Sequence, residues 1–470
     1  ALALRCLRAN LGALHDQSEI VEFDIRRSPQ TAAEKLLDCE PDILLFSVYI
    51  WNLTVTHETV AILRTLRPDI KIIIGGPEVS HDYETLPLFQ KADHLIRGEG
   101  EEVIEQLCRN LLEKNALSKV IDGPATDLNK IQLPYNEYTD KDIAHRRIYV
   151  ETSRGCPSKC QYCLSALECG VRFHPLEKLF PMFGKLIERG ARIFKFIDRT
   201  FNANPAHAAK VLRFFLDHRC EGMMLHLEWE PHLLPDELRQ LLSDAPDGFF
   251  QLEVGVQTLN TRVAEHIDRR LVLETIEENI RILSAMPSVH LHSDLIAGLP
   301  GETMETLTDG FDRLHACGPH EIQLGILKKL RGAPIAQHNT AFEMVYNTAP
   351  PYDVLQTSTM SFLELQAVRR LARFWDITVN NGRFPNTAPL IWIDEPSVFG
   401  AFMEWTGWLY RQTHATAGFT PARLGRLLFG FLTEKRKLDK QAVADAIEKD
   451  LGAIAAKTKG MERQSRRQVS

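Results

Sequence analysis

The chain of 470 residues lacks a secretory signal and has no uninterrupted apolar run long enough to cross a bilayer. The apolar stretch at 391–410 carries Asp394, Glu395 and Glu404, so we expect it to be amphipathic or buried. The sequence begins with Ala1 and not with Met, and we expect a few residues of the natural protein to precede it. We therefore expect a cytoplasmic protein without a membrane span.

The chain also lacks an excess of basic residues. The formal net charge is −7, which argues against an extended nucleic-acid surface but leaves room for a local basic groove. The composition is 44% hydrophobic and 25% charged, the balance of a folded protein with ample material for a core. A length of 470 residues then suggests two or three domains.

Cysteines are too few and too scattered for the disulfide framework of a secreted protein, with nine in the whole chain. Four of them lie together between positions 156 and 169, and that cluster needs its own explanation. The other five stand alone, and we interpret them as small buried hydrophobic residues. These five are Cys6, Cys39, Cys108, Cys220 and Cys317.

The first 114 residues alternate strand-like and helix-like segments. The apolar runs at 41–50, 71–77 and 92–100 predict buried strands, and helical patterns separate them. This alternation indicates an α/β domain with a parallel, doubly wound, Rossmann-like sheet, in which ligands lie at the carboxyl ends of the strands. The candidate binding residues at those ends are Ser47, Tyr49, Trp51, Asn52, Gly75, Gly76, Pro77, Glu78, Gly98, Glu99 and Gly100.

Three further regions complete the predicted organisation. Residues 115–147 are polar without sustained periodicity, and we expect a linker there. Residues 148–335 contain six apolar strands separated by helical stretches, which fits a partial (βα)6 barrel of the TIM type. Residues 336–470 are mostly helical in pattern and rich in aromatics, so we expect a helical C-terminal domain.

Three cysteines directly follow the first predicted barrel strand. Cys156, Cys160 and Cys163 have the spacing C-x3-C-x2-C. Three thiolates on one loop can hold three irons of a [4Fe-4S] cluster, which leaves the fourth iron open to a ligand from outside the protein. The alternatives are buried thiols and zinc, but structural zinc normally needs four ligands and Cys169 fits no common zinc spacing.

The run from Glu151 to Cys163 resembles the signature of the radical S-adenosylmethionine superfamily. The resemblance implies that S-adenosylmethionine binds the open iron and that one electron cleaves it to a 5'-deoxyadenosyl radical. It also implies that Tyr162 lies against the adenine. The superfamily often has a glycine-glycine-glutamate run after the second strand. This chain has Asp198 there instead, as a substitute contact to the methionyl amine or as a helix cap.

The same resemblance extends to the later barrel strands. It implies that Glu253 and Gln257 face the ribose and methionine of the cofactor, and a carboxylate on a buried strand is costly without such a partner. Arg269 matches a position whose side chain commonly reaches the cofactor carboxylate. The alternatives are that the neighbouring Arg270 makes this contact, or that both arginines are surface charges. The run 294–302, which includes Ile296, matches the segment that lines the adenine.

A doubly wound domain ahead of this barrel resembles the cobalamin-binding subgroup of the superfamily. Glycines after a strand let the backbone approach a large nucleotide tail, and Tyr49 and Trp51 are suited to cover a corrin face. The Asp-x-His-x-x-Gly motif that supplies a histidine to cobalt is absent. The resemblance therefore implies cobalamin without such a histidine, and the alternative is a scaffold that no longer holds cobalamin.

For function, the resemblance implies a cobalamin-dependent radical methyltransferase whose cofactors carry out the difficult chemistry. One alternative is a radical rearrangement or cyclisation that uses cobalamin without methyl transfer, and another is a radical enzyme without cobalamin. A non-enzymatic cobalamin or iron–sulfur sensor is the third. We expect a small molecule or biosynthetic intermediate as substrate and an external reductant such as flavodoxin or ferredoxin.

Overall fold

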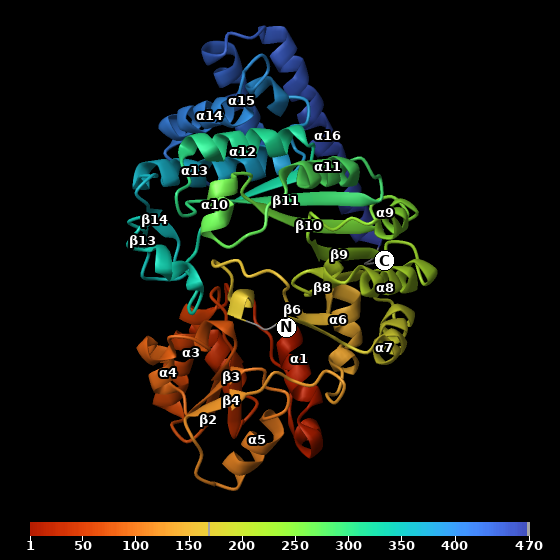
Figure 1. Cartoon of the computed structure of the whole chain (residues 1–470), viewed down its shortest axis with the longest axis vertical. Helices are drawn as coiled ribbons and strands as arrows, with labels where there is room; N and C mark the ends of the chain where they lie inside the picture. Colours follow the sequence, from red (N-terminus) through yellow and green to blue (C-terminus); the bar gives the residue numbers. More distant parts are fainter. Residues whose placement is uncertain (168–169, 468–470) are drawn as a thin grey trace.

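The computed structural model describes residues 1–167 and 170–467, so Cys169 lies outside the described residues. Figure 1 shows an N-terminal domain at one end of the molecule, a central parallel sheet, and a helical C-terminal region at the other end. This order confirms the predicted fold class. Among the described helices, none is long and apolar enough to cross a membrane.

The N-terminal sheet is parallel throughout, and helices cover both of its faces. Ile72 and Ile74 point into a core with the helices α2 and α3, whereas Ile73 between them points into a second core with α5. A near-continuous apolar strand is what a sheet covered on both faces requires. The elements are β1 (Ile43–Ser47), β2 (Lys71–Gly75), β3 (His94–Gly98), β4 (Val120–Gly123), α1 (Leu2–Ala9), α2 (Pro29–Leu37), α3 (Leu53–Leu66), α4 (Pro87–Lys91) and α5 (Ile104–Leu112).

The segment 115–147, which we expected to be a linker, contributes structure to both neighbouring domains. Its strand β4 pairs with β3 and completes the N-terminal sheet. The 3-10 helix η4 (Pro134–Glu137) and the helix α6 (Asp140–His145) then lead into the barrel. Strand β4 escaped prediction because a short, half-exposed edge strand has little apolar pattern.

The central sheet has six parallel strands in the order β12-β11-β10-β9-β8-β5, as a partial barrel requires. Helices follow the strands and cover the outer face (Figure 1). The strands are β5 (Ile148–Val150), β8 (Ile193–Phe196), β9 (Met224–Trp229), β10 (Phe250–Gln257), β11 (Val289–Ala297) and β12 (Glu321–Ile326). The helices are α7 (Leu176–Glu188), α8 (Pro205–Asp217), α9 (Asp236–Ser243), α10 (Thr261–His266), α11 (Leu273–Ser284) and α12 (Met304–Ala316).

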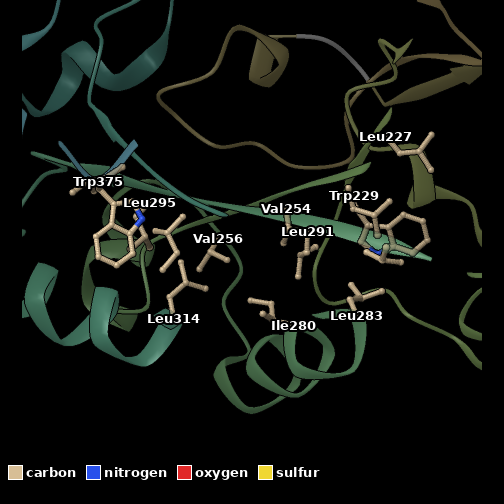
Figure 2. Packing of buried hydrophobic residues seen from close by; sticks show 14 of the residues in the cluster. Leu227, Trp229, Val254, Val256, Ile280, Leu283, Leu291, Leu295, Leu314 and Trp375 are labelled. Atoms are coloured by element: carbon tan, nitrogen blue, oxygen red, sulfur yellow. The ribbon is translucent and has the colours of Figure 1, made fainter. Parts of the chain in front are cut away.

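Alternation along each strand separates the outer core from the barrel interior. On β10 the residues Val254 and Val256 are fully buried, and Figure 2 shows them packed towards Ile280 of α11 and Leu314 of α12. The alternate positions of β10 are only partly buried, and the side chains there, Gln251, Glu253 and Gln257, point to the other face of the sheet. The polar side chains of β10 therefore face the interior of the barrel.

The C-terminal helices share one hydrophobic core with the barrel. Trp375 of α13 packs edge-on against Phe311 of α12 and against Phe402 of α14. The helices are α13 (Phe362–Trp375), α14 (Val398–Thr413), α15 (Pro421–Gly430) and α16 (Lys440–Arg467), and a π-helical turn η8 (Asp376–Asn380) extends α13. Two short strands, β13 (Val345–Tyr346) and β14 (Val354–Gln356), precede them.

A side chain of the π-helical turn completes the open edge of the barrel. The amide of Asn380 accepts a hydrogen bond from the backbone N–H of Ile322 at 3.2 Å and donates one to the backbone carbonyl of Ile322 at 3.0 Å. Ile322 lies on β12, the last strand of the sheet. The asparagine thus satisfies the groups that a seventh strand would have paired, and it blunts an exposed edge.

Candidate functional site

The cysteine loop lies at the carboxyl end of the first barrel strand. It lies between the two strands of an antiparallel ribbon, β6 (Ser153–Gly155) and β7 (Val171–Phe173). Gly155 has a φ of +95°, which glycine adopts without strain, so the chain can turn into the loop. Cys160 is buried, Cys156 and Cys163 are half-buried, and all three are free thiols.

Polar donors surround the sulfurs of this loop. The backbone N–H of Ser158 donates to Cys156 Sγ at 3.4 Å, and Thr200 Oγ1 lies 3.4 Å from the same sulfur. Arg269 Nη1 donates to Cys160 Sγ at 3.4 Å, and its second terminal nitrogen donates to the carbonyl of Gly255. Donors directed at sulfur suit thiolates, and three such sulfurs on one loop are the donor set of an iron–sulfur cluster.

Arg269 also has capacity for an anionic ligand. Burial works against its charge, but the nearby Tyr162 and Cys160 raise the pKa of Arg269, so it remains a cation. Its Nε is buried and has no hydrogen-bond partner among the described residues. A buried guanidinium with one unused donor fits a carboxylate such as that of S-adenosylmethionine. The structure thus brings Arg269, Tyr162 and the cysteine loop together, and their contacts with a cofactor stay predictions.

Asp198 is held by hydrogen bonds within the chain. Its side chain is 0% exposed and accepts hydrogen bonds from Thr152 N, Thr152 Oγ1 and Ser153 Oγ at 2.7–3.1 Å. It caps no helix, because the cap of the following helix α8 is Asn204. Burial raises the pKa of Asp198 against these hydrogen bonds. In the structure this carboxyl therefore anchors the start of the cysteine loop, and its contact with the methionyl amine stays a prediction.

Glu253 lies deeper in the barrel than we expected. Its carboxylate is 2.5 Å from His226 Nε2 and 3.4 Å from Lys195 Nζ, both on neighbouring strands. Burial opposes its charge, but the interactions with His226, Glu228 and Lys195 lower the pKa of Glu253 to about 2. Burial and Glu253 raise the pKa of Glu228 to about 8, so the two carboxyls share one proton. Glu253 thus has partners within the protein, and its contact with the cofactor stays a prediction.

Gln257 and Ile296 lie nearer the carboxyl ends of their strands. Gln257 has a φ of +70° at the end of β10. Its side chain folds over Gly255, where a Cβ would come within 2.4 Å of the amide nitrogen. Ile296 on β11 pairs with Gly325 on β12. These positions remain candidates for cofactor contact, on the same side of the sheet ends as Arg269.

The strand ends β1 and β2 of the N-terminal domain form an exposed aromatic platform. Tyr49 and Trp51 stack with ring centroids 4.5 Å apart, and Trp51 is 62% exposed. Asn52 holds this loop, because its side chain accepts from Tyr49 N at 2.8 Å and donates to Ser47 O at 2.9 Å. Gly76, with a φ of +110°, leaves no room for a Cβ, which would lie 2.6 Å from Val48 O. A flat exposed ring pair beside a close backbone turn fits a planar macrocycle such as a corrin.

Several of the other predicted N-terminal residues contact distant parts of the chain. Glu78, which follows Pro77 at the start of a 3-10 helix, is buried and accepts from Tyr352 Oη at 2.6 Å. Gly98 abuts Gly123 of β4, and a Cβ on Gly100 would lie 2.7 Å from Leu7 of α1. Gly98 itself is exposed, so ligand contact at the third strand end stays a prediction, and Gly75 lies beside it on β2.

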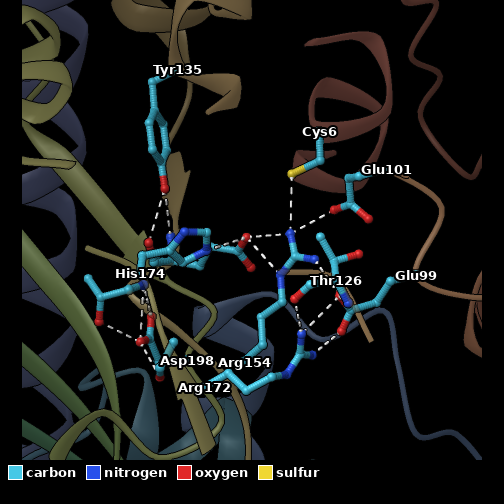
Figure 3. A network of polar contacts seen from close by, with 12 residues as sticks. Cys6, Glu99, Glu101, Thr126, Tyr135, Arg154, Arg172, His174 and Asp198 are labelled. Carbon is cyan, nitrogen blue, oxygen red and sulfur yellow. Dashed lines mark hydrogen bonds and ion pairs between the residues drawn. The ribbon is translucent and has the colours of Figure 1, made fainter. Parts of the chain in front are cut away.

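An arginine that the sequence did not single out connects the two domains. Arg154, two residues before Cys156, donates to Glu101 at 2.7 Å, to Glu99 at 3.0 Å and to Glu151 at 2.7 Å (Figure 3). The same figure shows Arg172 against Glu99. His174 Nε2 lies 3.2 Å from Glu151 Oε1. Burial opposes ionisation of Glu151, but His174 and Arg154 lower its pKa to about 2.

Three family models match the N-terminal, central and C-terminal regions of the chain. Residues 1–108 match the B12 binding domain, residues 150–314 match the Radical SAM superfamily, and residues 340–465 match a family described as a protein of unknown function. The first two matches cover the aromatic platform and the cysteine loop respectively. Together they imply the three cofactors that the sequence suggested, namely a [4Fe-4S] cluster, S-adenosylmethionine and cobalamin.

Curated relatives are similar over part of the chain. An uncharacterized methyltransferase of Pyrococcus horikoshii is 26% identical over 57% of this chain and 62% of its own length. The cobalamin-dependent radical SAM methyltransferase TokK of Streptomyces tokunonensis is 24% identical over 61% of this chain and 47% of its own length. The chain therefore spans about half to somewhat under two thirds of the relatives it matches.

A solved structure shows the same fold. The radical S-adenosylmethionine methyltransferase TsrM of Kitasatospora setae, with tryptophan substrate and a SAM analog bound, superposes with a TM-score of 0.59 at 18% identity. The superposition covers 78% of each chain. At this identity the similarity supports the arrangement of the domains and not a shared substrate.

Proposed function

We propose that this chain, which belongs to the radical S-adenosylmethionine proteins with a B12-binding domain, is a methyltransferase that acts on an unactivated centre of a small molecule. The observation that carries the proposal is the contact between the two cofactor domains. Arg154 fastens the cysteine loop to the loop after β3 of the N-terminal domain. Transfer between two cofactors requires that both be held in fixed relation to one substrate.

When bound, the cluster and S-adenosylmethionine supply a 5'-deoxyadenosyl radical, and cobalamin supplies the methyl group. Around them the chain's own residues have three tasks. Cys156, Cys160 and Cys163 would hold the cluster, and Arg269 would stabilise the Cys160 thiolate and orient the cofactor carboxylate through its unused Nε. Asp198 would keep the loop in place by accepting hydrogen bonds at its start.

The N-terminal platform would position cobalamin. Tyr49 and Trp51 would cover one face of the corrin, while Gly76 allows the backbone to come close to it. The proposed substrate is a small molecule or biosynthetic intermediate, and the proposed electron donor is a flavodoxin or ferredoxin. Tyr162, Gln257 and Ile296 are proposed to line the S-adenosylmethionine site.

The test is product analysis of the anaerobically reconstituted protein with S-adenosylmethionine and dithionite. A cobalamin-dependent methyltransferase yields S-adenosylhomocysteine only when cobalamin is present, together with 5'-deoxyadenosine. The variant Cys160→Ala is expected to lose 5'-deoxyadenosine, whereas Cys220→Ala, which changes a half-buried cysteine away from the loop, is expected to retain it. Formation of 5'-deoxyadenosine without any S-adenosylhomocysteine would instead indicate radical chemistry without methyl transfer.

A further inference from the structure

Three side chains converge at the end of the barrel opposite to the cysteine loop. His290 Nε2 lies 2.8 Å from Glu321 Oε1, and His292 Nε2 lies 3.0 Å from the same oxygen. The three ligand atoms all lie within 4.8 Å of one another. His290 and Glu321 lie at the amino ends of β11 and β12. The cysteine loop, by contrast, follows the carboxyl end of β5.

The backbone fixes this arrangement. His290 and His292 are two residues apart on β11, so their side chains leave the same face of the sheet. Glu321 is the direct partner of His292 in the parallel pairing of β11 with β12. Because regular strands hold all three donors, little reorganisation is needed to bring them to a common ligand.

Hydrogen bonding alone leaves one nitrogen with conflicting partners. His292 Nε2 faces the carboxylate oxygen of Glu321, which only accepts, and it also lies 3.3 Å from the Gln251 amide nitrogen, which only donates. A ring nitrogen is either a donor or an acceptor in one tautomer. With a cation in the centre, the nitrogen directs its lone pair to the metal, and the Gln251 amide can turn its oxygen inwards as a fourth ligand.

A third imidazole borders the three side chains. His320 stacks at a tilt on His290 and accepts a hydrogen bond from Leu291 N at 3.1 Å. Glu321 supplies the carboxylate oxygen that faces both His290 and His292.

We propose that His290, His292 and Glu321 bind one divalent transition-metal cation of the zinc type. Two imidazoles and a carboxylate are a common ligand set for zinc. Metal bonds of about 2.0–2.2 Å in tetrahedral geometry place ligand atoms about 3.4 Å apart, so the present spacings of 2.8 and 3.0 Å need to open only slightly. The side chains are 46%, 15% and 26% exposed respectively, so an ion and a water ligand can enter from solvent.

The cation would fasten the open edge of the barrel. It would cross-link β11 to β12, and β12 is the last strand of the sheet. The site lies outside the machinery proposed for methyl transfer and does not depend on that function. Zinc binding and catalysis can therefore fail or succeed independently.

The experiment is a zinc titration of the holoenzyme with its iron–sulfur cluster assembled, after removal of loosely bound metal with a chelator. Cluster assembly occupies the loop cysteines, so they do not compete for zinc. We expect one zinc per chain in addition to the cluster iron, and X-ray absorption with nitrogen and oxygen ligands only. His292→Ala and Glu321→Gln should each weaken zinc binding at least about tenfold, with iron content unchanged.

His218→Ala provides the matched control, because it removes an exposed histidine that follows α8 and hydrogen-bonds the carbonyl of Phe214. Glu321→Gln keeps the size of the side chain and so guards against loss of folding in His292→Ala. The proposal is overturned if the wild-type holoenzyme binds no zinc at micromolar concentration. It is also overturned if both variants bind zinc as the wild type does, or if the absorption spectrum shows sulfur ligands at about 2.3 Å.

Discussion

Arg154 donates a hydrogen bond of 2.7 Å to Glu101 and thereby joins the cysteine loop of the barrel to the N-terminal domain. The two residues are 53 positions apart in the sequence. Each would be costly to bury alone, because an unpaired charge loses its hydration. As a pair, they hold the B12-binding domain and the radical SAM domain in register at the point where their cofactor regions meet.

Replacing Arg154 with Ala should destabilise this junction strongly. Glu99, Glu101 and Glu151 would each lose a buried ion-pair partner, and breaking a buried pair costs about 3–5 kcal/mol. We expect a lower midpoint in urea denaturation and loss of cobalamin on desalting. Arg213→Ala removes a solvent-exposed pair with Glu237, and we expect it to change the free energy of unfolding by less than about 1 kcal/mol. Equal effects of the two variants would contradict the role given to Arg154.

Replacing Trp51 with Ala should weaken cobalamin binding without unfolding the protein. The ring is 62% exposed, so its removal costs little core packing, yet it forms half of the stacked platform. Loss of an aromatic face contact of about 0.5–1.5 kcal/mol corresponds to a rise in Kd of roughly 2- to 13-fold. Titration of the apoprotein with cobalamin measures this change. Phe362→Ala removes a partly exposed ring of α13 and should leave the Kd unaltered.

The pH dependence of stability should change when Glu302 becomes Gln. Burial raises the pKa of Glu302 from its ordinary 4.5 to about 8, although Gly298 N donates to it at 2.9 Å. Because the folded state holds this proton more tightly than the unfolded state, protonation of Glu302 stabilises the fold. This contribution is complete below the ordinary pKa of 4.5 and is lost as the pH rises through 8. The Gln side chain keeps the acceptor and carries no charge to bury.

We therefore expect the Tm of the wild type to fall more steeply than that of Glu302→Gln between about pH 6 and pH 8.5, in thermal melts at matched ionic strength. The exposed Glu305 lies three positions later at the start of α12, and Glu305→Gln serves as the control with an unchanged pH profile. Parallel profiles for the wild type and Glu302→Gln would show that Glu302 is ionised in the folded protein.

Replacing Asn380 with Ala should destabilise the open edge of the barrel. The backbone N–H and carbonyl of Ile322 would lose their partner, and a buried polar group left unsatisfied costs about 1–3 kcal/mol. Asn381, the next residue, is exposed, and Asn381→Ala should cost much less. Urea denaturation measures the loss in free energy of unfolding for both variants. An equal loss for Asn381→Ala and Asn380→Ala would contradict the role given to Asn380.

Local pattern in the sequence was sufficient for most of the architecture. Strand β10 alternates apolar and polar residues from Phe250 to Gln257, and its two faces are arranged as that alternation predicts. The cysteine spacing likewise predicted a single loop after a strand, because three residues so close in sequence must lie close in space. By contrast, the short polar edge strand β4 has no such periodicity and was missed.

Only the tertiary structure decided which polar side chains act together. Asp198 and Glu253 were correctly placed on the barrel by the sequence, but their partners, such as Ser153 and His226, come from other segments of the chain. The links of Arg154 to the N-terminal domain and of His292 to Glu321 across two strands arise in the same way. A strand or loop is encoded by neighbouring residues, whereas an ion pair depends on how distant elements pack, and no local pattern records that packing.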